Sequence, residues 1–506
     1  MPPACGLGAR VSRSCGNCRT IKRRCDQQRP QCGQCIRARE KCTGYRDEWD
    51  LVFRDQTNHT IKLSKKKAAK NAASNKAVTE VIHQYLSSPP PISYGIGPSL
   101  GEIGLNYFLH DFVSGGRSPS RGYLNYIPAA YGANAEHPTL ITSMAAVGLG
   151  ALAARQPELV SHARAKYSQA IRYVNLALAS PVEAVKDSTL MSVISLGVFE
   201  HVSNFESWIQ HVKGAAALVV ARGKSQFSSP AAIPLFNQVR ADMAVACIQT
   251  IQPFPDDMRE LQEEAAKYAD TSSVFWLLGV LATRCATLFV DITKNNNSDN
   301  PASDFIPWFH FLDEATALRN DLQEAISLLA IQEPYTTVVD ASGVTSSAMH
   351  NGRYDLYKTS WAIRLWNNSR MLEIIACEIE CWLINKILAT DLAQSTQVHL
   401  DLKLTLQDLL QIMSKRGADV LASVPQSLGL LSVAESQSSV DSTSHTYVSG
   451  GYMLIWSLYT VGKSPVVDHK TRQWVIKQLL GISESAGIAI ALQLAQDIVE
   501  IDVMAN

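Results

Sequence analysis

The chain has 506 residues and a mass of 55.4 kDa, enough for about two to four domains. Apolar residues make up 46% and charged residues 18%, which are ordinary values for a soluble globular protein and exclude a wholly disordered or fibrous chain. The longest weakly polar run, residues 139–154, is shorter than the ~20 residues of a bilayer span. No N-terminal stretch has the order of a secretion signal. We therefore expect neither secretion nor a membrane partner.

The net charge of zero hides a strong asymmetry along the chain. Residues 1–78 carry 18 Lys and Arg against 6 Asp and Glu, a charge of +12, whereas residues 79–506 carry 28 against 40, a charge of −12. A basic head predicts a polyanionic partner, with nucleic acid as the first candidate. A merely solvated basic tail is the alternative that composition alone leaves open.

The head contains six cysteines whose spacing repeats, with the pattern C-x2-C-x6-C-x6-C-x2-C-x6-C. They are Cys15, Cys18, Cys25, Cys32, Cys35 and Cys42. The pattern is an internal repeat with an offset of 17 residues, because CGNCRTIKRRC at 15–25 aligns with CGQCIRAREKC at 32–42. Lys22 falls opposite Arg39 in this alignment. The sequence therefore predicts two equivalent halves.

Each half has the ligands of a metal site. A C-x2-C pair lets two thiolates converge on one tetrahedral metal ion. The third cysteine lies about two helical turns further on, so a continuous helix would return it to the same face. Three ligands per half are too few for tetrahedral zinc, and six thiolates serve two zinc ions only if two of them bridge both ions. The repeat makes Cys15 and Cys32 the expected bridges, because they are equivalent.

Two other uses of these cysteines compete with a two-zinc cluster. A disulfide framework would suit a small secreted domain, but no secretion signal precedes it. A single zinc ion held by Cys15, Cys18, Cys32 and Cys35 would leave two cysteines idle at matched positions. Both alternatives are therefore less favoured than two zinc ions.

The head resembles the fungal Zn2Cys6 binuclear cluster transcription factors over residues 15–45. It shares with them the six cysteines, the basic stretch RTIKRRC, Asp26, Pro30 and the pair Gly44-Tyr45. The resemblance implies two short helices around two zinc ions, with the first helix in the major groove of double-stranded DNA. It also implies that Lys22 makes the main contact to a CGG-type triplet, although Ile21 replaces a residue that is basic in many members. The implied protein is a nuclear regulator of genes transcribed by RNA polymerase II. Such genes could belong to a metabolic or secondary-metabolite gene cluster.

The charge of the head agrees with a DNA partner. Between Cys15 and Cys42 there are eight Lys and Arg and two acidic residues, and six thiolates with two Zn²⁺ add −2, so the unit carries about +4. Guanine offers O6 and N7 as acceptors, which suits Lys22 as the base-reading residue. We assign phosphate contacts to Arg19, Arg23 and Arg24. The alternative is that these residues only solubilise a unit without an apolar core.

A linker follows at residues 46–99. Its basic run at 62–70 predicts a nuclear import signal or further phosphate contacts. Apolar residues at helical spacing over 78–86 predict a short amphipathic helix, which leaves a homodimer open but is too short for a stable coiled coil. Three prolines at 89–91 mark the boundary with the body.

The body has a helical period from about residue 100 onward. Apolar stripes run along 160–178 and 205–219, and further helices are predicted near 137–155, 182–202, 273–293, 307–330, 355–389, 402–414, 450–462 and 470–496. Loops are predicted at 295–304, 340–352 and 434–450. The expected organisation is a disordered tail at 1–14, a Zn2Cys6 unit at 15–45, the linker at 46–99 and an all-α domain at 100–506. The fold class is thus mostly all-α.

The body also resembles the fungal-specific transcription factor domain, over residues 137–253. The stretches HPTLITSMAAVGLGALAAR, KYSQAIRYVNLAL and ESWIQHVKGAAALVVARG carry this resemblance. It implies a regulatory domain whose partners include a second copy of the chain, the transcription machinery or a small-molecule effector. A zinc-stapled scaffold for protein interactions is the competing function.

No enzyme is expected, because we find no P-loop, G-x-S-x-G or H-E-x-x-H motif. The letters from Gly148 to Ala153 fit GxGxxA, but they lie inside a helical stripe, and a nucleotide-binding turn needs a strand before it. Close helix packing is the favoured interpretation of these small residues.

Overall fold

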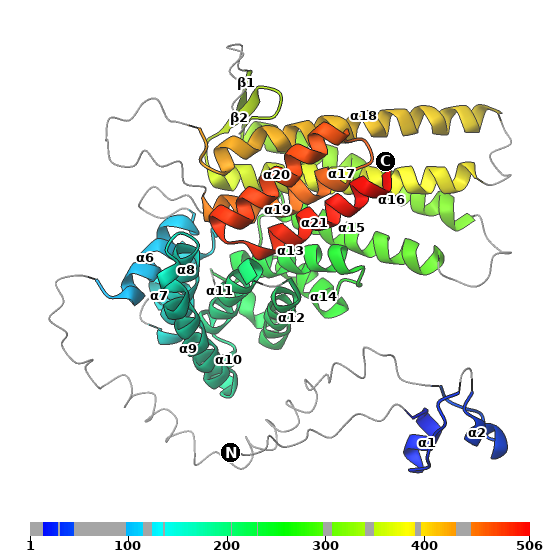
Figure 1. Cartoon of the computed structure of the whole chain (residues 1–506), viewed down its shortest axis with the longest axis horizontal. Helices are drawn as coiled ribbons and strands as arrows, with labels where there is room; N and C mark the ends of the chain where they lie inside the picture. Colours follow the sequence, from blue (N-terminus) through cyan, green and yellow to red (C-terminus); the bar gives the residue numbers. More distant parts are fainter. Residues whose placement is uncertain are drawn as a thin grey trace. The chain divides into compact units, whose positions relative to one another are not determined.

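The structure is a computed structural model that divides into two compact units, Met1–Tyr94 and Gly95–Asn506 (Figure 1). It describes residues 14–28, 31–44, 98–114, 124–134, 137–203, 205–229, 231–296, 306–339, 349–389, 396–431 and 447–505. The predicted tail before residue 14, the basic run at 62–70 and the amphipathic helix at 78–86 lie outside the described residues.

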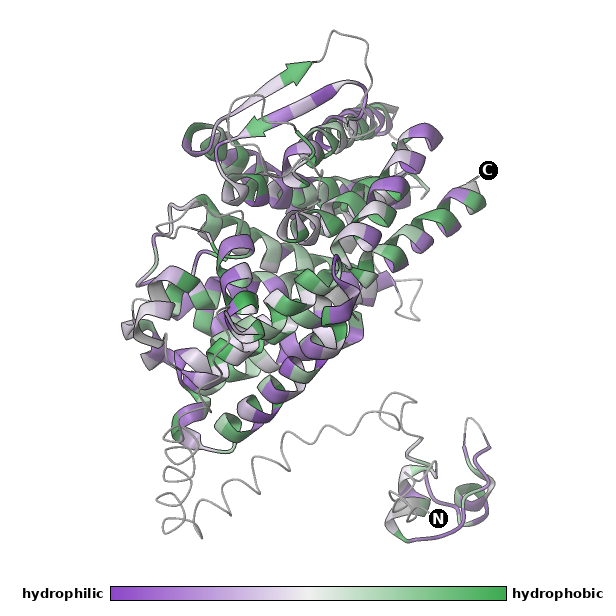
Figure 2. Ribbon diagram, turned by 60° about the vertical axis from the view of Figure 1, so that its left-hand side comes forward, coloured by the Kyte–Doolittle hydropathy of each residue, from purple (hydrophilic) through white to green (hydrophobic). Residues whose placement is uncertain are grey.

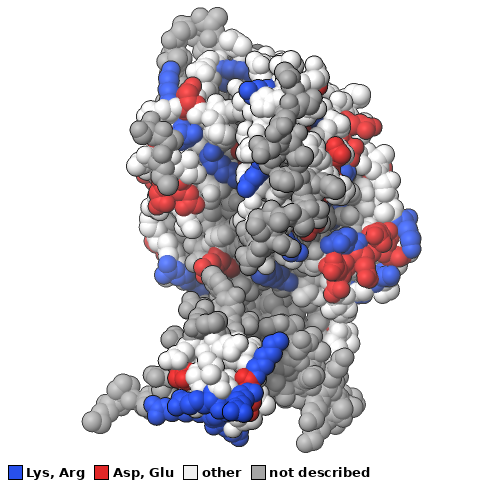
Figure 3. All heavy atoms as spheres, turned by 90° about the vertical axis from the view of Figure 1, so that its right-hand side faces the viewer, with Lys and Arg blue, Asp and Glu red and all other residues white. Residues whose placement is uncertain are grey.

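The first unit is built from two five-residue helices, α1 (Gly16–Thr20) and α2 (Gly33–Arg37). Each helix begins directly after the first cysteine of its half, so the two halves are equivalent, as the repeat predicts. The first helix was expected after Cys18, but it begins before that residue and contains it. The buried interior of this unit consists of sulfur atoms, because Cys15, Cys18, Cys32 and Cys35 are fully buried. The apolar side chains of Ile21 and Ile36 are more than half exposed. In the view of Figure 3, Lys and Arg gather in a band on the part of this unit that the structure describes.

The helices of the first unit are shorter than predicted. Helix α1 ends at Thr20, and Lys22 has a left-handed backbone with φ 53°. The expected two helical turns from Cys18 to Cys25 are therefore wrong, and the third cysteine returns after a chain reversal. The same reversal occurs after α2, where Arg39 has φ 54°. A helix could not continue through a left-handed residue without losing its hydrogen-bond ladder.

The second unit is helical almost throughout, which confirms the expected fold class (Figures 1 and 2). Its N-terminal helices are α6 (Leu100–Asp111), α7 (Ile127–Asn134), α8 (Pro138–Ala153), α9 (Val160–Leu178), α10 (Pro181–Ala184), α11 (Asp187–Ser203) and α12 (Phe205–Arg222). The later helices are α13 (Ala232–Thr250), α14 (Asp256–Ala265), α15 (Val274–Asn296), α16 (Ile306–Gln332), α17 (Ser360–Leu388), α18 (Thr396–Ser427), α19 (Val448–Lys463), α20 (His469–Ala486) and α21 (Ala489–Ala505). Two short 3-10 turns lie at Pro157–Leu159 and Lys224–Ser228.

The predicted stripe on α12 is the buried face of that helix. Six of its apolar residues are buried, namely Trp208, Ile209, Val212, Ala215, Ala216 and Val219. The stripe on α9 is buried only in its middle, because Val160 and Leu178 at the two ends are exposed. An amphipathic helix buries the part of its stripe that meets neighbours, and α9 packs on α8 and α11.

Small residues let α6 and α8 approach closely. A Cβ atom on Gly148 would overlap the backbone of Gly104, and one on Gly104 would lie 2.5 Å from the backbone oxygen of Ala145. Both glycines lie inside helices. The helix-packing interpretation of the GxGxxA letters is therefore confirmed.

A two-stranded hairpin, which the sequence pattern did not predict, interrupts the helices. Strand β1 (Tyr335–Val339) pairs antiparallel with β2 (Arg353–Tyr357), with Tyr335 opposite Tyr357. The helix predicted from residue 355 begins instead at Ser360, after a Thr359 cap whose hydroxyl accepts from the amide of Ala362. The hairpin lies beside α18 in Figure 1. The β-branched run TTVV explains the strand.

Helix α15 is longer than the 139–154 run considered from the sequence, and it also contains a long apolar stretch. By length and composition it could cross a membrane, but 56% of the apolar window is buried inside the unit. The helix packs against α13, α16 and α17. Burial among other helices is what a core helix of a large helical domain shows.

Candidate metal centre and nucleic-acid interface

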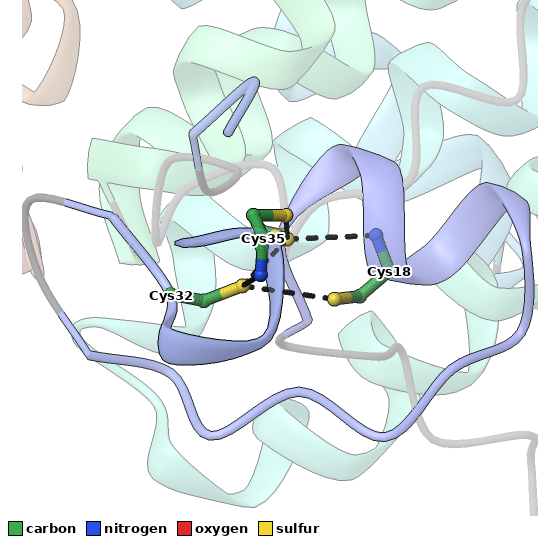
Figure 4. Close-up of side chains that lie close together, drawn as sticks. Cys18, Cys32 and Cys35 are labelled. Carbon is green, nitrogen blue, oxygen red and sulfur yellow. Dashed lines mark hydrogen bonds between the residues drawn. The ribbon is translucent and has the colours of Figure 1, made fainter. Parts of the chain in front are cut away.

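Four sulfur atoms converge between α1 and α2 at distances suited to zinc. Figure 4 labels three of the four residues, Cys18, Cys32 and Cys35. The Sγ atoms of Cys15 and Cys32 are 3.5 Å apart, those of Cys15 and Cys35 3.7 Å, and those of Cys18 and Cys32 3.6 Å. Tetrahedral zinc with Zn–S bonds of ~2.3 Å places its sulfurs about 3.8 Å apart. The donor set and its spacing therefore fit zinc.

The remaining two cysteines lie at the edge of the same cluster. Cys25 and Cys42 are partly buried and pack against the four central sulfurs. The Cys25 sulfur accepts from the backbone amide of Cys15 at 3.4 Å, and it forms a second potential ligand group with Asp26 and Cys32. All six predicted ligands are thus brought together, four of them at the centre and two at the edge.

Backbone amides at the start of each helix point at the first sulfur of that half. The amide of Cys18 donates to Cys15 at 3.5 Å, and the amide of Cys35 donates to Cys32 at 3.3 Å. These two contacts are equivalent in the repeat. Amide hydrogen bonds favour the thiolate, which is the form that binds zinc.

Burial opposes the thiolate at the two central positions. Desolvation raises the pKa of Cys15, and it raises the pKa of Cys32 to about 12. Although desolvation acts in the same direction on Cys25, hydrogen bonds from the backbone amides of Cys15 and Gln27 lower the pKa of Cys25 to about 7. Zinc must therefore displace protons from the two central thiols when it binds.

Polar contacts that the sequence analysis missed join the two halves. Asp26 accepts from the backbone amide of Gly33 at 3.0 Å, at the start of α2. The side chain of Asn17 donates to the Lys41 carbonyl at 2.7 Å, and the Thr43 hydroxyl donates to Asn17 at 2.9 Å. The contact between Asp26 and Gly33 had one signal in the sequence, which is an acidic residue a few positions before the C-G-x-C motif. Carboxylates favour the N-terminal ends of helices, and α2 begins at this motif.

The predicted DNA-contacting residues do not share one environment. Lys22 and Arg24 are exposed, whereas Arg19 is described only as a backbone position in α1. Arg23 is half-buried, and its guanidinium donates to the sulfurs of Cys18 and Cys35 and to the carboxylate of Glu40. The hydrogen bond to Cys18 raises the pKa of Arg23. Lys22 and Arg24 are therefore available to DNA, and Arg23 is engaged inside the unit.

Comparison with known proteins agrees with this geometry. Residues 13–50 match the family model of the fungal Zn(2)-Cys(6) binuclear cluster domain, and residues 105–252 match that of the fungal specific transcription factor domain. No curated protein and no solved structure gives a match. These two domain matches, together with the sulfur cluster, support a zinc-dependent DNA-binding transcription factor.

The chain carries the two domains of the fungal Zn(2)-Cys(6) transcription factors, as the sequence resemblance implied. Its cluster domain binds two zinc ions. This result confirms the two-zinc prediction over the single-zinc and disulfide interpretations. Families of this kind are generally nuclear and typically non-enzymatic.

Proposed function

We propose that the protein is a nuclear, sequence-specific regulator of RNA polymerase II genes that reads CGG-type triplets in the major groove. Residues 15–45 would form the DNA-binding domain and residues 100–506 the regulatory domain. The observation that carries the proposal is the exposed Lys22 at the chain reversal directly after α1, on a unit fixed by the sulfur cluster. Target genes in a metabolic or secondary-metabolite cluster would be consistent with the family.

The sulfur contacts support Cys15 and Cys32 as the bridging ligands. Each of the three close sulfur pairs includes Cys15 or Cys32, whereas Cys18 and Cys35 form no such pair with each other in the described part of the chain. Bridging requires this pattern, because only a bridging sulfur neighbours the ligands of both metal ions. One ion would have Cys15, Cys18, Cys25 and Cys32 as ligands, and the other Cys15, Cys32, Cys35 and Cys42. Bound zinc supplies the folding energy that this unit cannot obtain from an apolar core.

The exposed cations supply two kinds of DNA contact. Lys22 has the donor chemistry to reach guanine O6 and N7, so it would provide base selection. Arg24 is exposed two residues further on and would bind phosphate, as would Arg19. The resulting affinity should fall steeply with salt, because phosphate binding releases counterions.

Selection from random duplexes with the zinc-loaded full-length chain tests this proposal. We expect enrichment of CGG-type triplets, and the spacing between triplets would report one copy or two copies of the chain on DNA. Enrichment of no sequence, or the same enrichment after zinc is removed, would contradict the proposal and would favour the protein-interaction scaffold.

A cavity in the second unit supports a small-molecule effector. Its volume is about 370 Å³, and it lies between α13, α15 and α17 beside the end of α19. Phe289, Ile375 and Trp382 form apolar walls, whereas Glu378 and Lys463 add opposite charges. This size and mixture suit a small amphipathic molecule. We propose that an effector of this class binds there.

Filling the cavity tests this assignment. The fluorescent anion 1-anilinonaphthalene-8-sulfonate combines aromatic rings with an acidic group, and Ile375→Trp should weaken its binding to the full chain. Leu410→Trp, on the exposed side of α18, is the matched control. Equal dye binding by both variants and the unsubstituted protein would place the dye elsewhere and contradict the assignment.

A further inference from the structure

We propose that Arg23 is a positioning residue that ties the two halves of the zinc cluster together and does not contact DNA. This inference rests on the proposed two-zinc arrangement with Cys15 and Cys32 as bridges. It assigns a different role to one of the four basic residues that the sequence analysis gave to DNA.

The guanidinium spans the two halves through three hydrogen bonds. Its Nε lies 3.4 Å from the sulfur of Cys18, in the first half, and its Nη2 lies 3.5 Å from the sulfur of Cys35, in the second half. The same Nη2 lies 3.0 Å from Oε2 of Glu40. Under the proposed ligand assignment, Cys18 and Cys35 are terminal ligands of different zinc ions. Arg23 therefore joins two sulfurs that no metal ion joins.

The repeat explains why Arg23 and Glu40 meet. They are 17 residues apart, so they are equivalent positions of the two halves. The amide of Arg23 donates to the carbonyl of Cys18 at 2.8 Å, and the amide of Glu40 donates to the carbonyl of Cys35 at 2.9 Å. Two equal charges at these positions would repel each other across the pseudo-twofold axis. The chain instead has opposite charges there, and the two halves attract.

Electrostatics favours this location for a cation. Six thiolates and two Zn²⁺ ions carry a net charge of −2, and hydrogen bonds from a charged donor stabilise thiolate ligands. The half-exposed ion pair with Glu40 would contribute little by itself, so the contacts to the sulfurs are the main effect. A lysine could not replace Arg23, because the planar guanidinium reaches both sulfurs at once, whereas an ammonium is a point charge.

Zinc release and salt dependence separate a positioning role from a phosphate contact. We would measure release from the full-length chain with the chelating dye 4-(2-pyridylazo)resorcinol, and DNA affinity over a series of salt concentrations. Arg23→Gln and Arg23→Lys should accelerate zinc release by about tenfold, which is the effect of losing hydrogen bonds to a charged group. The slope of log affinity against log salt should stay unchanged for any variant that still holds two zinc ions.

Arg24→Gln is the matched control, because Arg24 is the adjacent exposed arginine. It should leave zinc release unchanged and reduce the salt slope by about one. If Arg23→Gln gave the same result as Arg24→Gln, the proposed positioning role would be wrong.

A charge swap provides a second test. Its outcome can be read from the double variant even if the single variant Arg23→Glu does not fold. Arg23→Glu alone places a carboxylate against two thiolates and should lose zinc fastest. The double variant Arg23→Glu, Glu40→Arg should recover slow zinc release, because the pseudo-twofold axis places the new arginine against the same two sulfurs. No recovery in the double variant would overturn the inference. A zinc content other than two in the unsubstituted protein would instead overturn the proposed cluster on which it rests.

Discussion

Lys22 and Arg39 occupy equivalent positions in the two halves of the zinc unit, and both have a left-handed backbone, with φ of 53° and 54°. Residues with a side chain rarely adopt this conformation, which costs about 1–2 kcal/mol. Each residue follows a five-residue helix and reverses the chain so that the third cysteine of its half reaches the cluster. The proposed base-reading residue therefore lies on a turn that zinc ligation holds in place.

The strain at this turn predicts opposite effects of two substitutions at Arg39. Arg39→Gly should stabilise the zinc-loaded unit by up to about 1 kcal/mol, because glycine adopts positive φ without steric cost. Arg39→Val should destabilise it by at least about 1 kcal/mol, since a branched side chain clashes there. The chelator concentration that removes half of the zinc from the full chain measures both effects. Equal midpoints for the two variants would show that the turn is not strained.

Zinc affinity should fall as the pH falls. Burial raises the pKa of Cys15 and raises that of Cys32 to about 12, so both thiols hold their protons at neutral pH until zinc displaces them. Raised pKa values favour the protonated form, and each displaced proton makes zinc binding weaker by about tenfold for every unit of pH lowered. Calorimetric zinc titrations in buffers of different ionisation enthalpy should show proton release. A binding enthalpy that does not depend on the buffer would contradict this prediction.

The close contact of α6 with α8 predicts a position-specific cost of adding one methyl group. Gly148→Ala should destabilise the second unit by about 1–3 kcal/mol, because the new Cβ would overlap the backbone of Gly104. Gly214→Ala is the control, since Gly214 also lies inside a helix and has open space around its Cβ position. It should be neutral or stabilising by up to about 1 kcal/mol. Urea unfolding of both variants measures the difference, and equal midpoints would refute the contact.

Asp242 predicts a pH-dependent stability in the second unit. Burial raises the pKa of Asp242 from 3.8 to about 6, although Gln238 donates to both of its oxygens at 2.9 and 2.8 Å. The folded state then binds the proton more tightly than the unfolded state, so this group adds stability as the pH falls from about 7 to about 4. At pH 7 the ionised carboxylate lowers the free energy of unfolding.

Asp242→Asn should therefore raise the free energy of unfolding at pH 7 by up to about 3 kcal/mol. The gain should disappear near pH 4, where the carboxyl of the unsubstituted protein is already neutral. Denaturant unfolding at the two pH values measures this change, and a difference that stays constant with pH would argue against the raised pKa.

The sequence indicated which cysteines lie together better than it indicated their local structure. Regular spacing and the count of three per half identify Cys15 and Cys32 as equivalent, and this needs no knowledge of the backbone. The helix after Cys18 was predicted too long, because seven residues fit two helical turns as well as they fit a short helix and a reversal. The charge of Arg23 did not predict where its side chain points. Only the packed cluster shows that the guanidinium donates a hydrogen bond to Glu40.

The helical body shows the same limits. Apolar periodicity located many of the helices, but no segment was predicted for α6, α13 or α14. It also underestimated α18, which extends over Thr396–Ser427 where 402–414 was predicted. The segment predicted at 470–496 forms two helices, because Gly487 has φ 69° and ends α20. The hairpin β1–β2 was missed because five-residue strands carry too few residues for a clear period.

Native mass spectrometry of the zinc-loaded full-length chain tests the shared-sulfur cluster most directly. A cluster that shares two sulfurs should hold two zinc ions per chain, lose both ions in Cys15→Ser or Cys32→Ser, and keep one ion in Cys25→Ser. A bridging sulfur serves both ions, whereas Cys25 serves one. A single ion in the unsubstituted protein, or the same zinc content in Cys15→Ser and Cys25→Ser, would contradict the shared-sulfur cluster.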